Sequence, residues 1–297
     1  VYFMNKKVIS FISLVFIALA FVACSDEGPK QPSIFPTKPV NRNNFEQWLL
    51  KNYTYPYNVE VQYKLVDGET DINYTLSPAD SAKSAQLAII IKYLWFDAYN
   101  EVAGPELVKQ SAPRVLQMVG SSAFTRQQTE VVGTAEGGYK VSLYKVNDLT
   151  PAVLKDYKLM RTYYFHTMHH EFTHILNQLK PYDSQYDRIT ESDYVSGNWY
   201  GKSPRVAHRL GFVSPYAMDQ GREDFAEMLS YYVTLSESEW NDILQDAGTK
   251  GASLIKQKLE MVRSYMSASW NVDIDELRTA VLRRAGQIEK LDLTTLK

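Results

Sequence analysis

The chain has 297 residues, of which 45% are hydrophobic and 22% are charged, with 32 basic side chains against 34 acidic ones. This composition excludes a disordered, collagen-like or coiled-coil protein, and the net charge of −2 argues against a nucleic-acid-binding protein. The single cysteine, Cys24, excludes an internal disulfide framework and a zinc site built from several thiolates.

The first 23 residues predict a signal for export. Lys6 and Lys7 precede an apolar run over residues 8–23 that contains no charged side chain. A run of this length is short for a membrane span but typical of the hydrophobic region of a secretory signal. It ends directly before Cys24 in a sequence that resembles a bacterial lipobox, so we expect removal of residues 1–23 and lipidation of Cys24. A signal anchor with an incidental cysteine, or a soluble periplasmic protein, is the alternative.

The residues that follow Cys24 predict a tether. The acidic stretch Ser25-Asp26-Glu27 resembles the export signal of surface lipoproteins, and four prolines follow between residues 28 and 44. A polar, proline-rich stretch of this kind is extended and semi-rigid. We therefore expect residues 24–44 to tether the protein to the outer membrane through its lipid, with the protein exposed at the cell surface.

Residues 45–297 contain no second linker and no internal repeat, which predicts one domain. Its first part predicts a short helix that is capped by Asn43 or Asn44 and ends before Pro56, followed by a strand of alternating hydrophobic residues over 57–65. A second helix should run from the Ser77-Pro78 cap to about residue 100. Further strands are expected near residues 114–119, 128–133 and 139–144. A long helical stretch from Thr150-Pro151 to Lys180 follows, because Pro181 would remove a backbone hydrogen bond. From Glu223 onward the pattern is helical. Together these elements predict an α+β fold with a mixed N-terminal sheet, a helical C-terminal half and the histidine-rich helix between them.

Residues 170–174 read His-Glu-Phe-Thr-His, an HExxH motif on the long predicted helix. Histidines four residues apart lie one turn apart on one face, so His170 and His174 can bind one metal ion, and zinc suits neutral imidazole. Glu171 is then placed to accept a proton from the attacking water. His166 extends the same face but lies about 12 Å along the helix from His174, too far to share the ion. We expect His166 to support the site from behind or to lie at the surface.

A third ligand must come from elsewhere in the chain. A metzincin would place a glycine and then a histidine where this sequence has Asn177 and Lys180, so that class is excluded. Glu223 and Glu227 lie one turn apart on a predicted helix, opposite its apolar stripe. We expect Glu223 to bind the metal and Glu227 to support a ligand from behind, with the reverse assignment as the alternative. Asp193 is an alternative candidate for the third metal ligand.

These residues resemble the putative zinc-binding metallopeptidases described as substrate import-associated zinc metallohydrolase lipoproteins. The resemblance rests on residues 56–61, 169–176, 211–217 and 223–227. It implies a zincin-like fold, one zinc ion, and a gluzincin-type HExxH…E site with His170, His174 and Glu223 as ligands and Glu171 as general base. It also implies a lipoprotein that works beside an outer-membrane nutrient importer.

The segment from Glu223 to Glu227 is also similar to the third-ligand helix of the anthrax lethal factor type of gluzincin, in which a tyrosine upstream of the ligand stabilises the oxyanion. Tyr216 has this place here, and His208 is the other candidate donor. The expected function is therefore a zinc metallopeptidase that acts on a peptide or protein, with the substrate lying along strand 139–144 at the sheet edge. The alternatives are a non-catalytic binding lipoprotein with a zincin fold and a zinc hydrolase of a non-peptide amide bond.

Overall fold

The computed structural model describes residues 41–66, 73–124, 130–131, 133–136 and 139–296. The predicted signal peptide, Cys24 and most of the tether lie outside these residues. Asn43–Lys297 form one unit. No helix in the described part of the chain combines the length and hydrophobicity that a membrane span requires.

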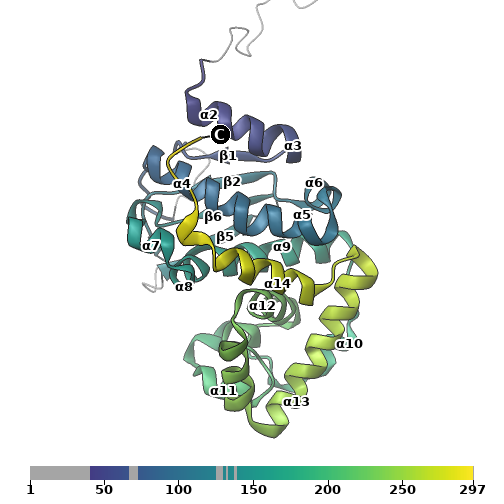
Figure 1. Cartoon of the computed structure of the whole chain (residues 1–297). Coiled ribbons are helices and arrows are strands. Elements are labelled where there is room, and N and C mark those ends of the chain that lie inside the picture. The colour runs from purple at the N-terminus through teal and green to yellow at the C-terminus, as the bar shows by residue number, and fades with distance from the viewer. Residues whose placement is uncertain (1–40, 67–72, 125–129, 132, 137–138, 297) are drawn as a thin grey trace, which may run out of the picture. The chain divides into compact units, whose positions relative to one another are not determined.

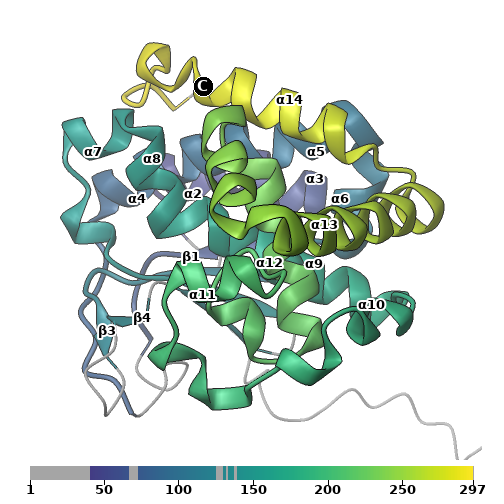
Figure 2. The same ribbon diagram turned by 90° about the horizontal axis from the view of Figure 1, so that it is seen from below.

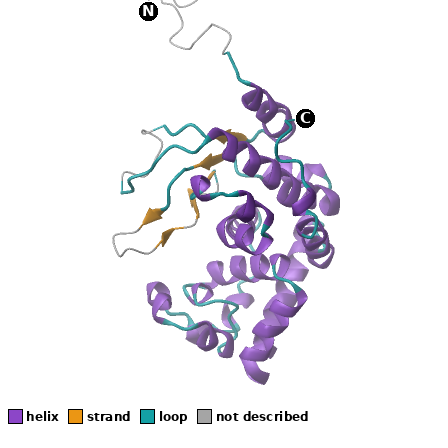
Figure 3. Ribbon diagram, turned by 60° about the vertical axis from the view of Figure 1, so that its left-hand side comes forward, coloured by secondary structure: helices purple, strands orange, loops and turns teal. Residues whose placement is uncertain are grey.

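A small mixed sheet forms one side of this unit, and Figure 3 shows its strands gathered there with the helices beside them. Its strands, in spatial order, are β1 (Glu60–Gln62), β2 (Val115–Met118), β6 (Lys140–Leu143) and β5 (Gly133–Glu136). β1, β2 and β6 are parallel, and β5 is antiparallel to β6. Val61, Leu116 and Val141 share one register row and are buried, as expected for parallel strands covered on their faces. A separate pair joins β3 (Ala123–Phe124) to β4 (Glu130–Val131).

The predicted place of strand 139–144 at the sheet edge is wrong. β6, which is this strand, lies between β2 and β5, and within the described residues β5 is the last strand on that side. The order differs because β5 folds back on β6 as its antiparallel neighbour, with Ala135 opposite Val141. A hairpin partner of this kind covers the edge that the strand would otherwise present.

Helices make up most of the rest of the unit (Figure 1). Their bounds are α2 (Asn44–Leu49), α3 (Tyr55–Tyr57), α4 (Ser81–Ile91), α5 (Asp97–Ala103), α6 (Pro105–Ser111), α7 (Pro151–Lys155), α8 (Tyr157–Met160), α9 (His166–Leu179), α10 (Gln185–Arg188), α11 (Pro204–Arg209), α12 (Gly221–Thr234), α13 (Glu237–Trp270) and α14 (Ile274–Ala285). α13 is kinked at Gly248, whose φ of 66° lies in the left-handed region. α12 contacts α9, α13 and α14, and Figures 1 and 2 show it in the middle of the helical half.

The first helix extends further than its sequence predicts. Asn43 caps α2 through a capping box with Glu46, as expected. The chain then stays helical through Pro56, because the π-helical turn Leu50–Thr54 widens the helix where the proline ring would clash with a carbonyl group. The helix ends where Asn58 adopts the left-handed conformation. The predicted strand over 57–65 therefore shrinks to β1, although four of its alternating hydrophobic side chains, those of Tyr57, Val59, Val61 and Tyr63, are buried.

Two other predicted helices start or break differently. α4 begins after Asp80, which caps it, whereas Pro78 pairs with Val119 in a β-bridge. The stretch over 151–180 is helical as predicted, but the extended backbone of Asp156 separates α7 from α8. The π-helical turn Arg161–Phe165 then leads into α9. Turns of this type are frequent next to functional sites.

α9 is anchored on one side by aromatic packing. Phe172 is buried, and its ring lies 4.9 Å from that of Trp95 and 5.0 Å from that of Tyr99 in edge-to-face contacts. Both partners belong to the helical segment that runs from α4 to α5. This packing holds α9 while its opposite face meets α12.

α12 is held from its other side by a buried ion pair. Lys258 of α13 and Asp224 of α12 are both fully buried, with the lysine Nζ 2.5 Å from the aspartate Oδ2. Lys258 also donates to the backbone oxygen of Gly211 at 3.0 Å, and Asp224 accepts the Tyr194 hydroxyl at 2.9 Å. The pair therefore joins α13, α12 and the loop that precedes Tyr216.

We expect Lys258→Met to lower the free energy of unfolding by about 3–5 kcal/mol, because it leaves the carboxylate of Asp224 buried without its cation. The double variant Lys258→Met/Asp224→Leu should recover most of this loss, since no buried charge remains. Urea unfolding of the three proteins measures both effects. A loss below about 1 kcal/mol in the single variant would contradict this role of the pair.

Candidate metal centre

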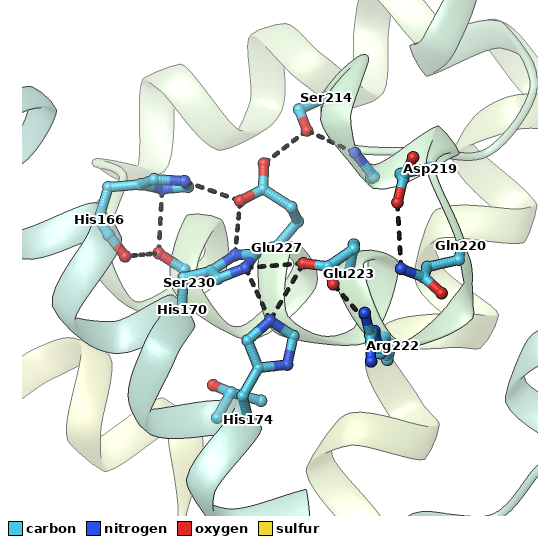
Figure 4. Close-up of polar contacts among 12 residues, drawn as sticks. His166, His170, His174, Ser214, Asp219, Gln220, Arg222, Glu223, Glu227 and Ser230 are labelled. Atoms are coloured by element: carbon cyan, nitrogen blue, oxygen red, sulfur yellow. Dashed lines mark hydrogen bonds and ion pairs between the residues drawn. The ribbon is translucent and has the colours of Figure 1, made fainter. Parts of the chain in front are cut away.

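The site lies where α9 and α12 pack against each other in opposite directions. His166, His170 and His174 are spaced by one turn on α9, and Glu223 and Glu227 are spaced by one turn on α12. His174 lies opposite Glu223, His170 lies between the two glutamates, and His166 lies opposite Glu227 (Figure 4). Matched spacing on two antiparallel helices thus forms one continuous row of polar contacts.

Three of these side chains point their ligand atoms at a common position. The Nε2 atoms of His170 and His174 are 3.0 Å apart, and the Oε2 atom of Glu223 lies 3.1 Å from the first and 3.0 Å from the second. A tetrahedral zinc ion with bonds of about 2.0–2.1 Å would separate its ligand atoms by about 3.3 Å. Two imidazole nitrogens and a carboxylate oxygen at this spacing match a catalytic zinc site.

The hydrogen bonds of His170 explain why this position favours a cation. Its Nδ1 lies 2.8 Å from Glu227 Oε1, and because a carboxylate only accepts, Nδ1 is the donor. A neutral His170 therefore turns the lone pair of Nε2 toward Glu223, which is also an acceptor. Burial opposes a charge on His170, but Glu223 and Glu227 raise its pKa to about 10. The residues thus attract positive charge at the position that zinc would take, and the set fits this metal.

The second set of converging atoms lies on the other side of His170. His166 Nε2 and His170 Nδ1 are each 2.8 Å from Glu227 Oε1, and the Ser214 hydroxyl donates to Glu227 Oε2 at 2.5 Å. Burial raises the pKa of Glu227, but the two imidazoles hold it well below its usual range. Both oxygens of Glu227 accept hydrogen bonds from side chains, so these atoms do not require a metal ion. Glu227 lies behind His170, on the side away from His174.

Glu223 has a partner at its other oxygen as well. Burial raises its pKa, but His170 and His174 hold the pKa well below its usual range. The Nε atom of Arg222 donates to Glu223 Oε1 at 3.1 Å, while most of the Arg222 side chain is exposed. Glu223 therefore remains ionised and turns Oε2 toward the two histidines.

Glu171 lies beside the proposed ligands but is not tied to them. Its side chain is half-buried, and in the described residues no hydrogen bond engages its carboxylate. Burial raises its pKa, and the charges of His170 and His174 act in the opposite direction. A carboxylate in this state is free to accept a proton from a molecule in the site.

Tyr216 reaches the site from the short 3-10 helix Tyr216–Met218. Its ring lies 5.7 Å from that of His170, and the ring of Trp199 packs edge-on against it at 5.0 Å. Burial and the nearby Glu223 raise the pKa of Tyr216, so its hydroxyl keeps its proton and can donate. The structure therefore brings this predicted residue to the site.

The remaining candidates lie elsewhere. Asp193 belongs to neither set of converging ligand atoms in the described chain. His208 lies on α11, where its Nδ1 is 2.7 Å from Asp246 and its Nε2 is 3.2 Å from the Val213 carbonyl oxygen, so both nitrogens are engaged away from the site. His169 is buried away from the side of α9 that carries His170 and His174, and it contacts the Tyr99 hydroxyl at 3.0 Å. Burial lowers its pKa to about 3, which keeps it neutral.

Two serines of the site were not predicted from the sequence. Ser214 binds Glu227, and its Oγ also accepts the backbone N–H of Ala217 at 3.1 Å, which ties the Tyr216 segment to α12. Ser230 lies 2.9 Å from His166 Nδ1. The spacing of Glu223, Glu227 and Ser230 on one helical face could have indicated Ser230. No local pattern indicates Ser214.

We expect the purified protein to bind close to one equivalent of zinc. His170→Ala should lose this zinc, because the variant removes the Nε2 atom that lies 3.1 Å from Glu223 Oε2 and would bind the metal. His208→Gln is the matched control, since His208 lies outside the site, and it should retain zinc. Metal analysis after dialysis measures the content. Full zinc in His170→Ala would contradict the assignment.

Comparison with known proteins identifies the family of this chain. The family model described as putative zinc-binding metallo-peptidase matches residues 38–275. A solved structure of a putative zinc-binding metallo-peptidase from Bacteroides caccae is 38% identical, with a TM-score of 0.76, and the match covers 89% of this chain and 100% of that one. None of the curated proteins matches the chain. The chain thus belongs to the family of putative zinc-binding metallo-peptidases.

Proposed function

We propose that this protein is a zinc-dependent peptidase of the gluzincin type, with His170, His174 and Glu223 as zinc ligands and Glu171 as general base. The observation that supports this most strongly is the convergence of His170 Nε2, His174 Nε2 and Glu223 Oε2 to within 3.1 Å of one another. The HExxH helix also places Glu171 next to the first ligand.

The chemistry divides between the metal and the chain. Zinc, when bound by these three side chains, supplies a Lewis acid that polarises a carbonyl group and activates water. Glu171 accepts the proton of the attacking water and passes it to the leaving nitrogen. Glu227 and Glu223 stay ionised and keep His170 and His174 in place.

Tyr216 is the proposed donor to the oxygen of the peptide carbonyl. Its hydroxyl keeps its proton, and its ring is fixed between His170 and Trp199. A fixed donor aimed at developing negative charge stabilises the transition state more than the ground state. The adjacent Ser214 holds this segment to Glu227, so Tyr216 and the proposed ligands share one support.

The substrate in this proposal is an extended peptide or protein segment. β5 contacts α9 and is the last strand of the sheet in the described residues. An extended peptide added to such an edge would lie beside the HExxH helix. β5 therefore replaces β6 as the proposed substrate strand.

The proposed location is the outer membrane, through a lipid on Cys24, with the folded part at the cell surface and beside a nutrient importer. The apolar run that ends at Cys24 and the tether after it support the lipid, and the family resemblance supports the importer. Cross-linking in cells would identify the importer.

We expect Glu171→Gln to bind zinc like the wild type but to lose peptide hydrolysis, by at least about 100-fold, because the amide cannot accept the proton. A peptide library digested by wild-type and variant protein, with zinc content measured on the same samples, tests this. Retained hydrolysis in Glu171→Gln would contradict the mechanism. Cleavage of non-peptide amides alone would replace the peptidase assignment.

Tyr216→Phe serves as the comparison in the same assay. It keeps the ring between His170 and Trp199 and removes the hydroxyl alone. Loss of one oxyanion donor should lower kcat by about 100–1,000-fold with little change in zinc content. An unchanged kcat would remove Tyr216 from the mechanism and leave Glu171 in it.

For the lipid, we expect Cys24→Ala to abolish labelling by radioactive palmitate and to release the protein from the outer-membrane fraction, because Cys24 is the sole cysteine of the chain. Fractionation of labelled cells measures both effects. Labelling that persists in the variant would exclude Cys24 as the lipid anchor.

A further inference from the structure

We propose that His166 is a positioning residue of the zinc centre, which holds Glu227 against the zinc ligand His170 and is itself oriented by Ser230. The inference rests on the zinc site of the proposed function, and it assigns a role to a third histidine that cannot reach the metal. Figure 4 shows the row of contacts from Ser230 through His166 and Glu227 to His170.

The buried carboxylate of Glu227 requires hydrogen-bond donors. Glu227 is only 2% exposed, and its negative charge is stable there only if both oxygens receive hydrogen bonds. Oε2 accepts the Ser214 hydroxyl, and Oε1 accepts from two imidazoles at 2.8 Å each. One of these imidazoles belongs to the proposed ligand His170, and the other to His166. His166 is thus the donor to Oε1 that does not depend on the metal.

Ser230 orients the His166 ring. Ser230 Oγ lies 2.9 Å from His166 Nδ1 and 2.7 Å from the backbone oxygen of His166. The hydroxyl can donate to Nδ1, or it can donate to the carbonyl oxygen and accept from Nδ1. Because the Glu227 carboxylate only accepts, Nε2 of His166 carries the hydrogen of that contact; the ring is neutral in the first arrangement and carries a hydrogen on both nitrogens in the second. Ser230 therefore fixes which ring nitrogen faces the carboxylate.

Glu227 links His166 to the metal. Glu227 accepts the Nδ1 hydrogen of His170, which leaves the lone pair of Nε2 for zinc and sets the plane of the ring. Without His166, Oε1 loses one of its two donors inside a buried site, and the carboxylate is held less firmly against His170. Loss of such an outer partner typically weakens metal binding by about 10–100-fold.

The same three atoms, His166 Nε2, His170 Nδ1 and Glu227 Oε1, could also be read as a second metal site. The hydrogen bonds favour the positioning role, because both imidazoles donate to Glu227 and a neutral His170 has one lone pair, which faces Glu223 and His174. A metal on Nδ1 would require His170 to lose its last ring hydrogen. Zinc stoichiometry separates the two roles.

The test is the zinc dissociation constant, measured by competition with a chelator, for the full chain and four variants. We expect His166→Ala to raise it by about 10–100-fold and His166→Gln to recover part of the loss, because the glutamine amide restores an N–H donor. Ser230→Ala should raise it by a smaller factor, since His166 remains. Thr167→Ala, on the same helix and also half-buried, is the matched control and should leave it unchanged.

Three results would overturn the inference. A dissociation constant of His166→Ala within about twofold of the wild type would show that Glu227 needs no help from His166. An equal loss in Thr167→Ala would trace the effect to the helix in general, and melting of the metal-free proteins would show the same loss. A second zinc equivalent in the wild type that disappears in His166→Ala would make His166 a ligand. None of these readouts requires hydrolysis, so a protein that binds zinc but cleaves no peptide would refute the proposed function alone.

Discussion

The site depends on the antiparallel packing of α9 against α12 at one register. Both helices repeat their polar side chains every turn, so His174 meets Glu223, His170 meets both glutamates, and His166 meets Glu227. A shift of one turn would place one of the two glutamates next to Thr162 or Gln178 and leave its carboxylate with one imidazole partner instead of two. The charges that form the site therefore also fix how the two helices pack. Stability and function share these contacts.

α12 carries buried acids on two sides. Glu223 and Glu227 face the histidines of α9, whereas Asp224 faces Lys258 of α13. Each acid has a cation or an imidazole donor within hydrogen-bonding distance, which is the condition for burying charge in a helix interface. Lys258 also holds the backbone of Gly211, and Ser214 holds Glu227. The segment that leads to Tyr216 is thus attached to α12 at both ends, which places the aromatic ring beside His170.

Local patterns predicted the parts of the site that depend on one helix. The HExxH spacing identified His170, Glu171 and His174 because helical period alone puts two of them on one face. The spacing of Glu223 and Glu227 opposite an apolar stripe made them candidates, but a sequence does not show which helix packs on α9. The order of β5 and β6, the helix through Pro56 and the role of Ser214 depend on contacts between distant segments. Sequence spacing excluded His166 as a ligand, and only the packing shows its contact with Glu227.

The two sides of His170 differ in a way that explains where a metal would bind. On the Nδ1 side, Glu227 receives hydrogen bonds from His170, His166 and Ser214, so the charge is balanced within the protein. On the Nε2 side, a neutral His170 turns its lone pair toward Glu223, which is also an acceptor, and His174 is more exposed. A cation is stabilised most on the Nε2 side, because there it binds nitrogen and oxygen acceptors for which the chain supplies too few hydrogen atoms. The buried contacts behind His170 therefore direct metal binding to the open side, next to Glu171 and Tyr216.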